Sequence, residues 1–181
     1  REEEENILDV KLEGFAVFGG NRLAGFFPEE LGRGINWIRG ETNLTALLLE
    51  DDQKMPIAME VIKGSSKILP HYENGRFSVN IQISVNSNIA EYMGKDNIFV
   101  RSKIQELNRK QEELVKKEAE TALKLTKELN ADVLGIGEAI YRKYPVKFRR
   151  LIGRNWLEIY PDIPVSVEVN SVIRRAYNIE E

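Results

Sequence analysis

The chain has 181 residues, of which 42% are hydrophobic and 30% charged, and its formal net charge is −3. A chain of this length buries roughly 70% of the surface that it exposes when unfolded, so we expect one self-sufficient domain. The lack of Cys excludes disulfides, thiolate nucleophiles and Cys-based metal sites, the single His excludes a multi-histidine centre, and the slight acidic excess argues against a general nucleic-acid binder.

The N-terminal segment begins REEEEN, with four consecutive Glu residues. It has neither the basic start nor the apolar run of a signal peptide, and the sequence contains no run of roughly 18 to 20 apolar residues that would span a membrane. We interpret residues 1–8 as a linker or frayed N-terminus and residues 9–181 as a single domain. Because the first residue is Arg1 rather than Met, we expect a piece of a longer chain that is itself soluble.

The first third of the chain predicts strands interrupted by one short helix. LEGFAVF (12–18) and RLAGFF (22–27) have strand character, and the Gly-Gly-Asn sequence between them suits the turn of a hairpin. A helix of about ten residues is predicted from Pro28 to Arg39, ending at a glycine. The apolar run 44–49 then predicts a strand that is covered on both faces, with a buried helix turn as the alternative.

Strict alternation of apolar and polar residues marks the clearest strands. It runs through 57–61 and 77–86 and returns at 163–173. The apolar rows are expected to pack against helices, while the row from Ser78 to Asn86 presents uncharged polar groups on the other face. His71 is predicted to lie exposed in the polar turn between the first two strands, with no role as a ligand or base.

From about residue 97 to residue 130 the apolar period becomes helical. Apolar residues recur at steps of three and four, which predicts one long amphipathic helix with Gln111 and Glu118 as polar interruptions. Gly135 and Gly137 are expected to end the long helix and to allow close helix packing.

Two shorter segments follow the glycines. A short helix is predicted to end before Pro145, and a third, basic turn is predicted to continue to Arg154. The order of elements predicts an α+β domain with a mostly antiparallel sheet of about five to six strands. The long amphipathic helix and the shorter helices are expected to pack on one face of that sheet.

Three carboxylates, Glu138, Glu158 and Asp162, are the candidates for acid–base chemistry, because they lie near glycines, Trp156 and Pro161, where a pocket is conceivable. No nucleophile, metal-ligand set or oxyanion motif accompanies them. The GIGEA sequence at 135–139 lacks the third glycine of a dinucleotide fingerprint, and KGSSK at 63–67 lacks the spacing of a phosphate loop. We therefore expect no catalytic residue, metal or cofactor, and keep a hydrolase that uses Glu138 or Glu158 as an alternative.

A run of basic residues interleaved with aromatic residues is the main candidate for a contact surface. Partner proteins, anionic lipid headgroups and nucleic acids are all recognised by such a pattern. The simpler explanation is a solvated helix face whose aromatic residues belong to the core. The basic cluster, as we call it below, consists of Arg142, Lys143, Lys147, Arg149, Arg150 and Arg154.

Four stretches, in this order, resemble one known family: GFAVFGGNRLAGFF, ELGRGINWIRG, ADVLGIGEAIYRKYP, and Trp156 with EIYPDIPVSVEVNSVIRR. Together they resemble the C-terminal domain of the Ger(x)C family, the C subunits of bacterial spore germinant receptors. The family pattern is strongest at residue types that indicate a structural role: Gly25, Gly34, Trp37, Gly135, Gly137, Glu138, Arg142, Tyr144, Pro145 and Trp156.

The resemblance implies a lipoprotein of the spore inner membrane, anchored by an acylated N-terminal Cys and acting beside the integral-membrane A- and B-type subunits of a nutrient receptor. This sequence has no lipobox Cys, so the anchor is implied for the parent chain only. The family carries no established catalytic residues. We therefore expect a non-enzymatic domain for protein–protein interaction and assembly, without nucleic acid, and keep direct binding of the nutrient as the alternative.

Overall fold

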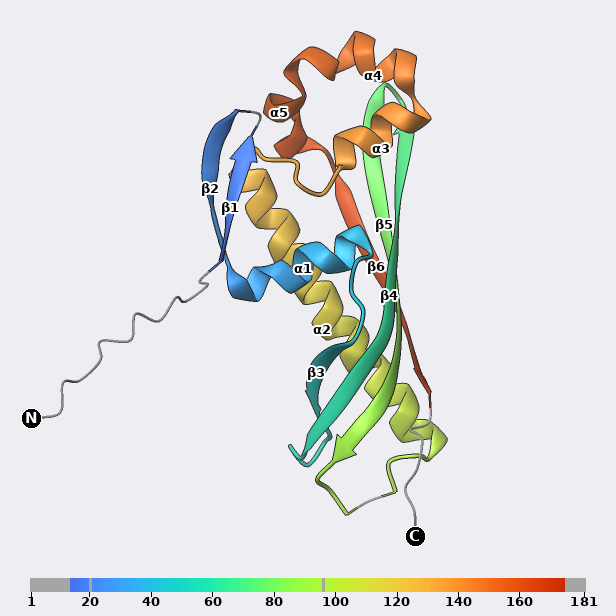
Figure 1. Cartoon of the computed structure of the whole chain (residues 1–181). Helices are drawn as coiled ribbons and strands as arrows, with labels where there is room; N and C mark the ends of the chain where they lie inside the picture. The colour runs from blue at the N-terminus through green and yellow to red at the C-terminus, as the bar shows by residue number, and fades with distance from the viewer. Residues whose placement is uncertain (1–13, 20, 96, 175–181) are drawn as a thin grey trace, which may run out of the picture.

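Alternating apolar residues build a four-stranded sheet, and two helices pack on one face of it (Figure 1). The computed structural model describes residues 14–19, 21–95 and 97–174. The linker predicted at residues 1–8 lies outside the described residues. The α+β class is confirmed, and the core lies between the sheet and the helices.

The main sheet has the strand order β3-β4-β5-β6. Its strands are β3 (Thr45–Glu50), β4 (Pro56–Glu73), β5 (Arg76–Tyr92) and β6 (Val165–Arg174). β4 pairs antiparallel with both of its neighbours, whereas β5 and β6 are parallel. A separate two-stranded sheet consists of β1 (Gly14–Gly19) and β2 (Arg22–Pro28).

The predicted single, mostly antiparallel sheet of five to six strands therefore differs from the structure in two respects. The N-terminal hairpin forms its own sheet and packs on the helices through Val17 and Phe27. After β5 the long helix carries the chain back to the end of the sheet where β5 begins, so β6 must run in the same direction as β5 (Figure 1).

The alternation predicted for β5 is confirmed by its burial. Its apolar residues from Phe77 to Val85 are at most 5% exposed, and the polar residues between them are half-buried or exposed. The turn between β4 and β5 consists of Asn74 and Gly75 alone, both with positive φ, as two-residue hairpins require. The prediction that His71 lies in this turn is wrong, because His71 pairs with a β5 residue inside the ladder.

β3 is covered on one face only, contrary to the prediction. Leu47 and Leu49 are buried, whereas Leu48 is 68% exposed. The reason is its position, since β3 is the edge strand of the sheet and the helices cover a single face.

The helix layer consists of α1 (Glu29–Arg39) and α2 (Arg101–Glu128), which contact each other on the same face of the sheet. α1 ends at Gly40, whose φ of 70° is the left-handed conformation that glycine adopts readily. α2 is about 42 Å long at 1.5 Å per residue. The polar interruption Gln111 is fully buried in it, where its Oε1 accepts a 2.8 Å hydrogen bond from Ser87.

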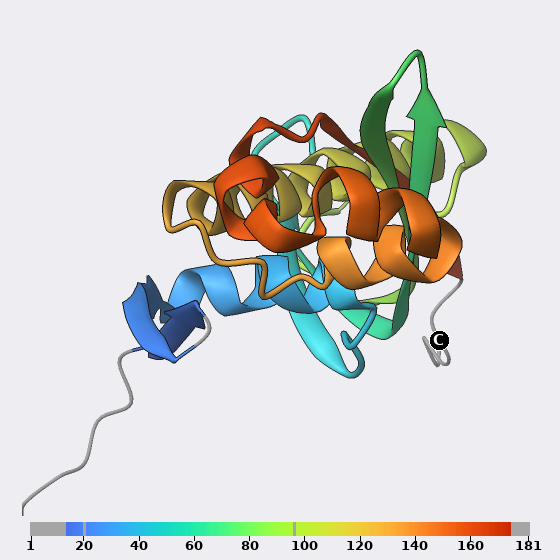
Figure 2. The same cartoon turned by 90° about the horizontal axis from the view of Figure 1, so that it is seen from above.

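Short helices close one end of the domain. They are α3 (Ile136–Lys143), α4 (Pro145–Leu151) and α5 (Trp156–Ile159), with single 3-10 turns at Gly153–Asn155 and Tyr160–Asp162. Figure 2 looks down on this end, where the short helices lie over the helix layer. Gly135 and Gly137 were predicted to end α2, but they do not. α2 ends earlier, before Asn130, which has the positive φ that stops a helix.

Candidate interaction surface

A single carboxylate anchors the start of α3. The Asp132 side chain accepts hydrogen bonds from the backbone N–H groups of Ile136 at 2.9 Å and Gly137 at 2.6 Å. It also accepts one from Nε1 of Trp156 at 3.0 Å. A Cβ at position 137 would lie 2.5 Å from that indole nitrogen. Asp132 and the glycine thus fix α3 against α5.

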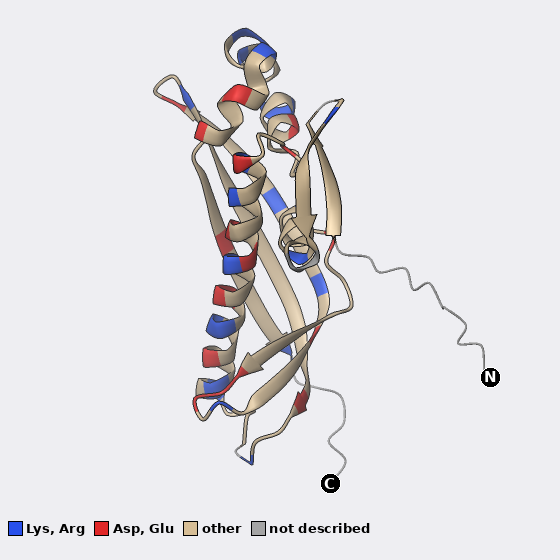
Figure 3. Cartoon of the chain, turned by 90° about the vertical axis from the view of Figure 1, so that its left-hand side faces the viewer, with Lys and Arg blue, Asp and Glu red and all other residues tan. Residues whose placement is uncertain are grey.

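The break between α3 and α4 follows from the Tyr144-Pro145 sequence. A residue before proline is disfavoured in the helical region, and Tyr144 adopts φ −132° and ψ 60°. Pro145 is the first residue of α4, where its missing N–H has no partner to lose. The two helices therefore meet at an angle, and both carry basic side chains at this end of the molecule (Figure 3).

All six residues of the basic cluster are exposed. Arg142 lies 3.5 Å from Glu138 on the same helix, and both side chains are at least 70% exposed. Lys143 donates a 2.7 Å hydrogen bond to the backbone carbonyl of Pro70 in β4. Lys143 therefore links α3 to the sheet.

The remaining cations divide into two kinds. Lys147 lies over the ring of Tyr72 at 4.1 Å, and Arg149 donates a 2.6 Å hydrogen bond to the hydroxyl of Tyr141. Such cation–ring contacts fix the direction of a basic side chain while its charge stays in water. Arg150 and Arg154 form no ion pair or hydrogen bond within the part of the chain that the structure describes.

Aromatic rings lie between the basic cluster and the core of the domain. Two groups of ring contacts, with centroids 4.7 to 6.3 Å apart, join the helices to the β4–β5 hairpin and to the core. Their rings are Tyr72, Phe77 and Tyr144, and Tyr141, Phe148, Trp156 and Tyr160. Burial raises the pKa of Tyr160, whose hydroxyl lies 2.6 Å from that of Thr126. Tyr144, Phe148 and Trp156 are partly buried and pack against the core, whereas Tyr141 is 37% exposed.

The three candidate carboxylates have separate surroundings. Glu138 pairs with Arg142, Glu158 is exposed, and Asp162 lies near Lys127. Burial lowers the pKa of Lys127, which donates to the backbone carbonyl of Ile163. Among the described residues, no group of three or more His, Cys, Asp or Glu could hold a metal ion. The arrangement offers solvated charges rather than a pair of carboxylates facing one substrate.

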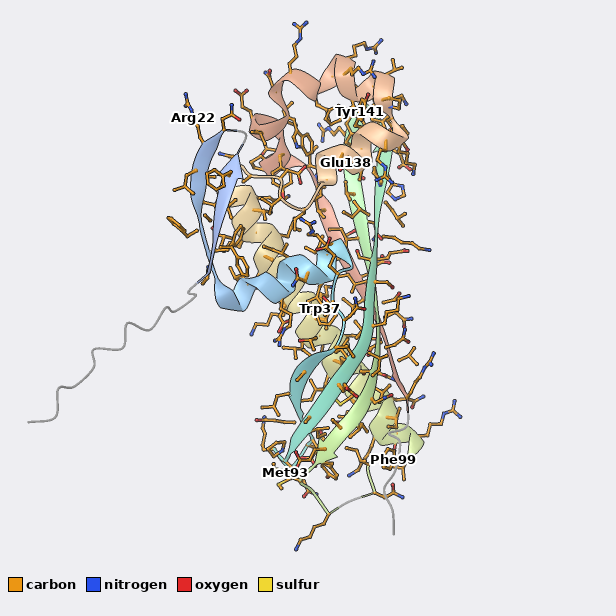
Figure 4. The ribbon with its side chains drawn as sticks, viewed as in Figure 1. Arg22, Trp37, Met93, Phe99, Glu138 and Tyr141 are labelled. Atoms are coloured by element: carbon orange, nitrogen blue, oxygen red, sulfur yellow. The ribbon has the colours of Figure 1, made fainter. Side chains whose placement is uncertain are left out.

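Two of the family-pattern residues lie far from the basic cluster, where α1 crosses α2. Trp37 is fully buried, and its Nε1 donates a 2.8 Å hydrogen bond to Glu118 (Figure 4). The same carboxylate accepts a hydrogen bond from Nε of Arg33 at 2.9 Å and another from its Nη2. A Cβ on Gly34 would lie 2.3 Å from the backbone carbonyl of Glu118, so the helices approach closely there.

Sequence reasoning missed Arg33 and Glu118 as partners. Glu118 was predicted only to interrupt the apolar face of α2. The available signal was its spacing, three residues after Val115 and four before Ala122, both fully buried. A charged residue on the inward stripe of a helix requires a partner on the neighbouring element.

An open cavity lies between the N-terminal hairpin and the short helices. It has a volume of about 440 Å³, and its lining includes Phe18, Asp132, Glu138, Tyr141, Phe148 and Trp156. Glu138 and Tyr141 lie on α3 at this end of the molecule (Figure 4). At the other side of the hairpin, a Cβ on Gly25 would lie 2.8 Å from Leu129, so the hairpin packs closely on the end of α2.

The family model described as "Spore germination B3/ GerAC like, C-terminal" matches residues 13–177. The chain belongs to this family. The resemblance to the Ger(x)C germinant receptor C subunits is thereby confirmed. None of the helices among the described residues is long and apolar enough to cross a membrane.

Two curated relatives come from Bacillus subtilis (strain 168). Spore germination protein KC is 23% identical over 168 residues, which cover 92% of this chain and 41% of the relative. Spore germination protein B3 is 23% identical over 165 residues, covering 89% of this chain and 44% of the relative. The chain thus spans less than half the length of the curated relatives that it matches.

A solved structure has the same fold. The crystal structure of the GerBC protein superposes with a TM-score of 0.76 at 20% identity, covering 90% of this chain and 51% of that chain. The two proteins therefore share a fold over most of this chain.

Proposed function

We propose that this chain is an assembly domain of a spore nutrient germinant receptor. In this proposal it is the non-enzymatic C-terminal domain of a C subunit, and it docks onto the integral-membrane A- and B-type subunits at the spore inner membrane. The parent chain supplies the N-terminal lipid anchor. The basic cluster is the docking surface, and nutrient-triggered germination depends on the assembly.

The observation that carries the proposal is the unbalanced charge at the α3–α4 end. The six cations of the basic cluster are all exposed, and Glu138 is the single carboxylate that pairs with them among the described residues. Val146 and Leu151, on α4, are 76% and 41% exposed. Cations beside exposed apolar groups, on a rigid aromatic base, are what a protein partner with acidic and apolar groups recognises.

Charge reversal tests the proposal directly. Arg149→Glu with Arg150→Glu, made in the full-length parent, changes the net charge of the cluster by four. We expect the C subunit to be lost from receptors purified from spores and the nutrient response to fall. Both side chains are exposed, so thermal unfolding of the 181-residue chain should change little.

A matched control carries the same charge change elsewhere. Lys63→Glu with Lys117→Glu alters two exposed lysines on β4 and α2, away from the short helices. The control should assemble and respond like the unaltered receptor. Full assembly of the Arg149 and Arg150 variant would show that the basic cluster is not the docking surface.

Direct nutrient binding is the second candidate, and the cavity beside α3 favours it. Its volume of about 440 Å³ lies within the range of small-molecule sites, and rings from Tyr141, Phe148 and Trp156 line it. A ligand at about 100 times its Kd should stabilise the fold by about 2.7 kcal/mol. Thermal unfolding with candidate amino acids and sugars measures this, and an unchanged melting temperature with each of them would favour the assembly role.

A further inference from the structure

The long strand β4 has one open edge. On one side it pairs with β5 along almost its whole length, from Ile57 to Glu73. On the other side β3 pairs only with the first part, Pro56–Val61. Beyond that point no strand within the described residues lies on this side of β4 (Figure 1). Such an edge presents backbone donors and acceptors to a possible partner.

The turn defines which backbone groups point to the open side. In a two-residue hairpin the residues that flank the turn, Glu73 and Arg76, form a hydrogen-bonded pair. Going back along β4 from Glu73, every second residue bonds to β5 through its backbone N–H and carbonyl. The backbone groups of the residues between them, at 70, 68, 66 and 64, point to the open side. Two contacts agree with this assignment: the N–H of Gly64 donates to Thr42 at 2.6 Å, and the carbonyl of Pro70 accepts from Lys143.

Ser66 and Ile68 lie between these two contacts and also point to the open side. No described residue forms a hydrogen bond with their outward backbone groups. Gly40 packs against Ser66, since a Cβ there would lie 2.8 Å from the Ser66 nitrogen. Ile68 is therefore the more accessible of the two. Pro70 has no N–H, so pairing along this edge would stop there.

The open edge borders a groove with a volume of about 1000 Å³. The last turn of α1, residues 66–70 of β4, the loop at 132–135 and one side of α3 line it. The hydroxyl of Ser66 is buried beside it without a hydrogen-bond partner in the described part of the chain. An unsatisfied hydroxyl and unpaired backbone groups in one groove favour a ligand that itself supplies backbone donors and acceptors.

The charges of the groove indicate the side chains of that ligand. Arg39 is paired with Glu41 at 3.0 Å, and Arg142 with Glu138. The carboxylate of Asp132 also lines the groove, where it accepts hydrogen bonds from N–H groups of α3 and Trp156. Two lysines have no carboxylate partner among the described residues: Lys67, which lies on the open stretch, and Lys143, whose ammonium reaches Pro70. The unbalanced charge is positive, so acidic side chains complement it.

We propose that the edge of β4 between Gly64 and Pro70 binds an extended peptide segment with acidic side chains, which adds to the sheet as a further strand. Backbone hydrogen bonds to Ile68 and to the carbonyl of Ser66 hold the segment, and Lys67 and Lys143 select its acidic residues. The partner strand lies between α1 and α3. This site is separate from Arg149 and Arg150, so it extends the docking surface of the proposed function to a second contact.

The test uses a labelled synthetic peptide, Glu-Val-Glu-Val-Glu-Val-Glu, and the 181-residue chain. Fluorescence anisotropy measures binding, and hydrogen exchange followed by NMR measures protection of each backbone amide. In the free chain the Ile68 amide should exchange quickly, while the amides of Lys67 and Leu69, which face β5, should be protected. Saturating peptide should slow exchange at Ile68.

Two variants separate the backbone from the side chain. Ile68→Pro removes the outward N–H at a position where the fold already accepts a proline two residues later. Ile68→Ala is the control, because it also removes the isoleucine side chain but keeps the backbone N–H. We expect Ile68→Pro to bind the peptide at least ten-fold more weakly than Ile68→Ala. The Arg149 and Arg150 reversal should bind it like the unaltered chain.

Three results would overturn the proposal. The first is equal binding by the proline and alanine variants. The second is equal binding of a peptide in which Lys replaces every Glu, which would remove the acidic preference. The third is protection of Ile68 that rises with protein concentration in the absence of peptide, which would assign the edge to a second copy of this chain.

Discussion

The carboxylate of Glu118 is the centre of the contact between α1 and α2, and its removal is the sharpest test of how the fold is held. Its side chain is 15% exposed and accepts hydrogen bonds from the indole of Trp37 and the guanidinium of Arg33. Trp37 is fully buried, so the carboxylate is the acceptor of a buried N–H. Glu118→Ala therefore leaves a buried donor unsatisfied.

The magnitude follows from the exposure of the two partners. An unsatisfied buried N–H costs about 1–3 kcal/mol. The guanidinium of Arg33 is 39% exposed, so water compensates for much of that lost pair, which we place at about 0.5–1 kcal/mol. The total loss for Glu118→Ala is about 1.5–4 kcal/mol. Glu118→Gln keeps an oxygen for Trp37 and loses only the charge, so we expect about 1 kcal/mol.

Urea unfolding, followed by circular dichroism, measures these losses. The midpoint should fall in the order Glu120→Ala, Glu118→Gln, Glu118→Ala, with similar slopes. Glu120 is the matched control, because it lies on the same helix, is 53% exposed and only approaches Lys116 at 3.9 Å. A Glu118→Ala variant within about 0.5 kcal/mol of the Glu120 control would refute the reasoning.

Three further predictions concern the packing around this contact and around α3. Gly34→Ala should destabilise the chain by about 1–3 kcal/mol in urea unfolding, because its Cβ would lie 2.3 Å from a backbone oxygen of α2. Asp132→Ala should lose about 1–2 kcal/mol and increase amide exchange in α3, since two N–H groups of its first turn lose their acceptor. Burial raises the pKa of Tyr160, so the folded state resists forming the phenolate and stability should fall as pH rises above about 10. Tyr160→Phe should remove that part of the loss in thermal unfolding at alkaline pH.

Local sequence patterns predicted the elements of this fold well. The alternation in β5, the helix that ends at Gly40 and the short helices on either side of Pro145 are all present. Each depends on interactions between residues close in the chain, or on one face packing against the core. The type of an element is therefore readable from one sequence, whereas its length is less so: the alternation at 57–61 covers only the first part of β4.

The arrangement of the strands was less accessible, because it depends on contacts between distant residues. Nothing local shows that β6 pairs parallel with β5, or that the N-terminal hairpin leaves the main sheet. The strand character of His71 was hidden by polar neighbours that resemble a turn, although the Asn-Gly pair alone suffices. The open edge of β4 likewise follows from the short length of β3 and has no sequence pattern of its own.

The basic cluster could be located from the sequence, but its organisation could not. The sequence showed six cations within a short stretch. The structure adds that Lys143 contacts Pro70 and that Lys147 contacts Tyr72. Those contacts join residues about seventy positions apart. The distinction between held and free cations therefore required the fold.

Charge distribution separates the two proposed contacts in a way that salt can reveal. Along α2, oppositely charged side chains alternate four residues apart, as in the pairs Arg109 with Glu113 and Lys124 with Glu128 (Figure 3). These pairs nearly cancel at a distance, whereas the basic cluster is unbalanced. Raising the ionic strength from about 0.1 M to about 1 M shortens the Debye length from about 10 Å to about 3 Å. Docking through the basic cluster should weaken strongly. The added strand at Ile68 should weaken less, because salt screens its contacts with Lys67 and Lys143 but leaves its backbone hydrogen bonds in place.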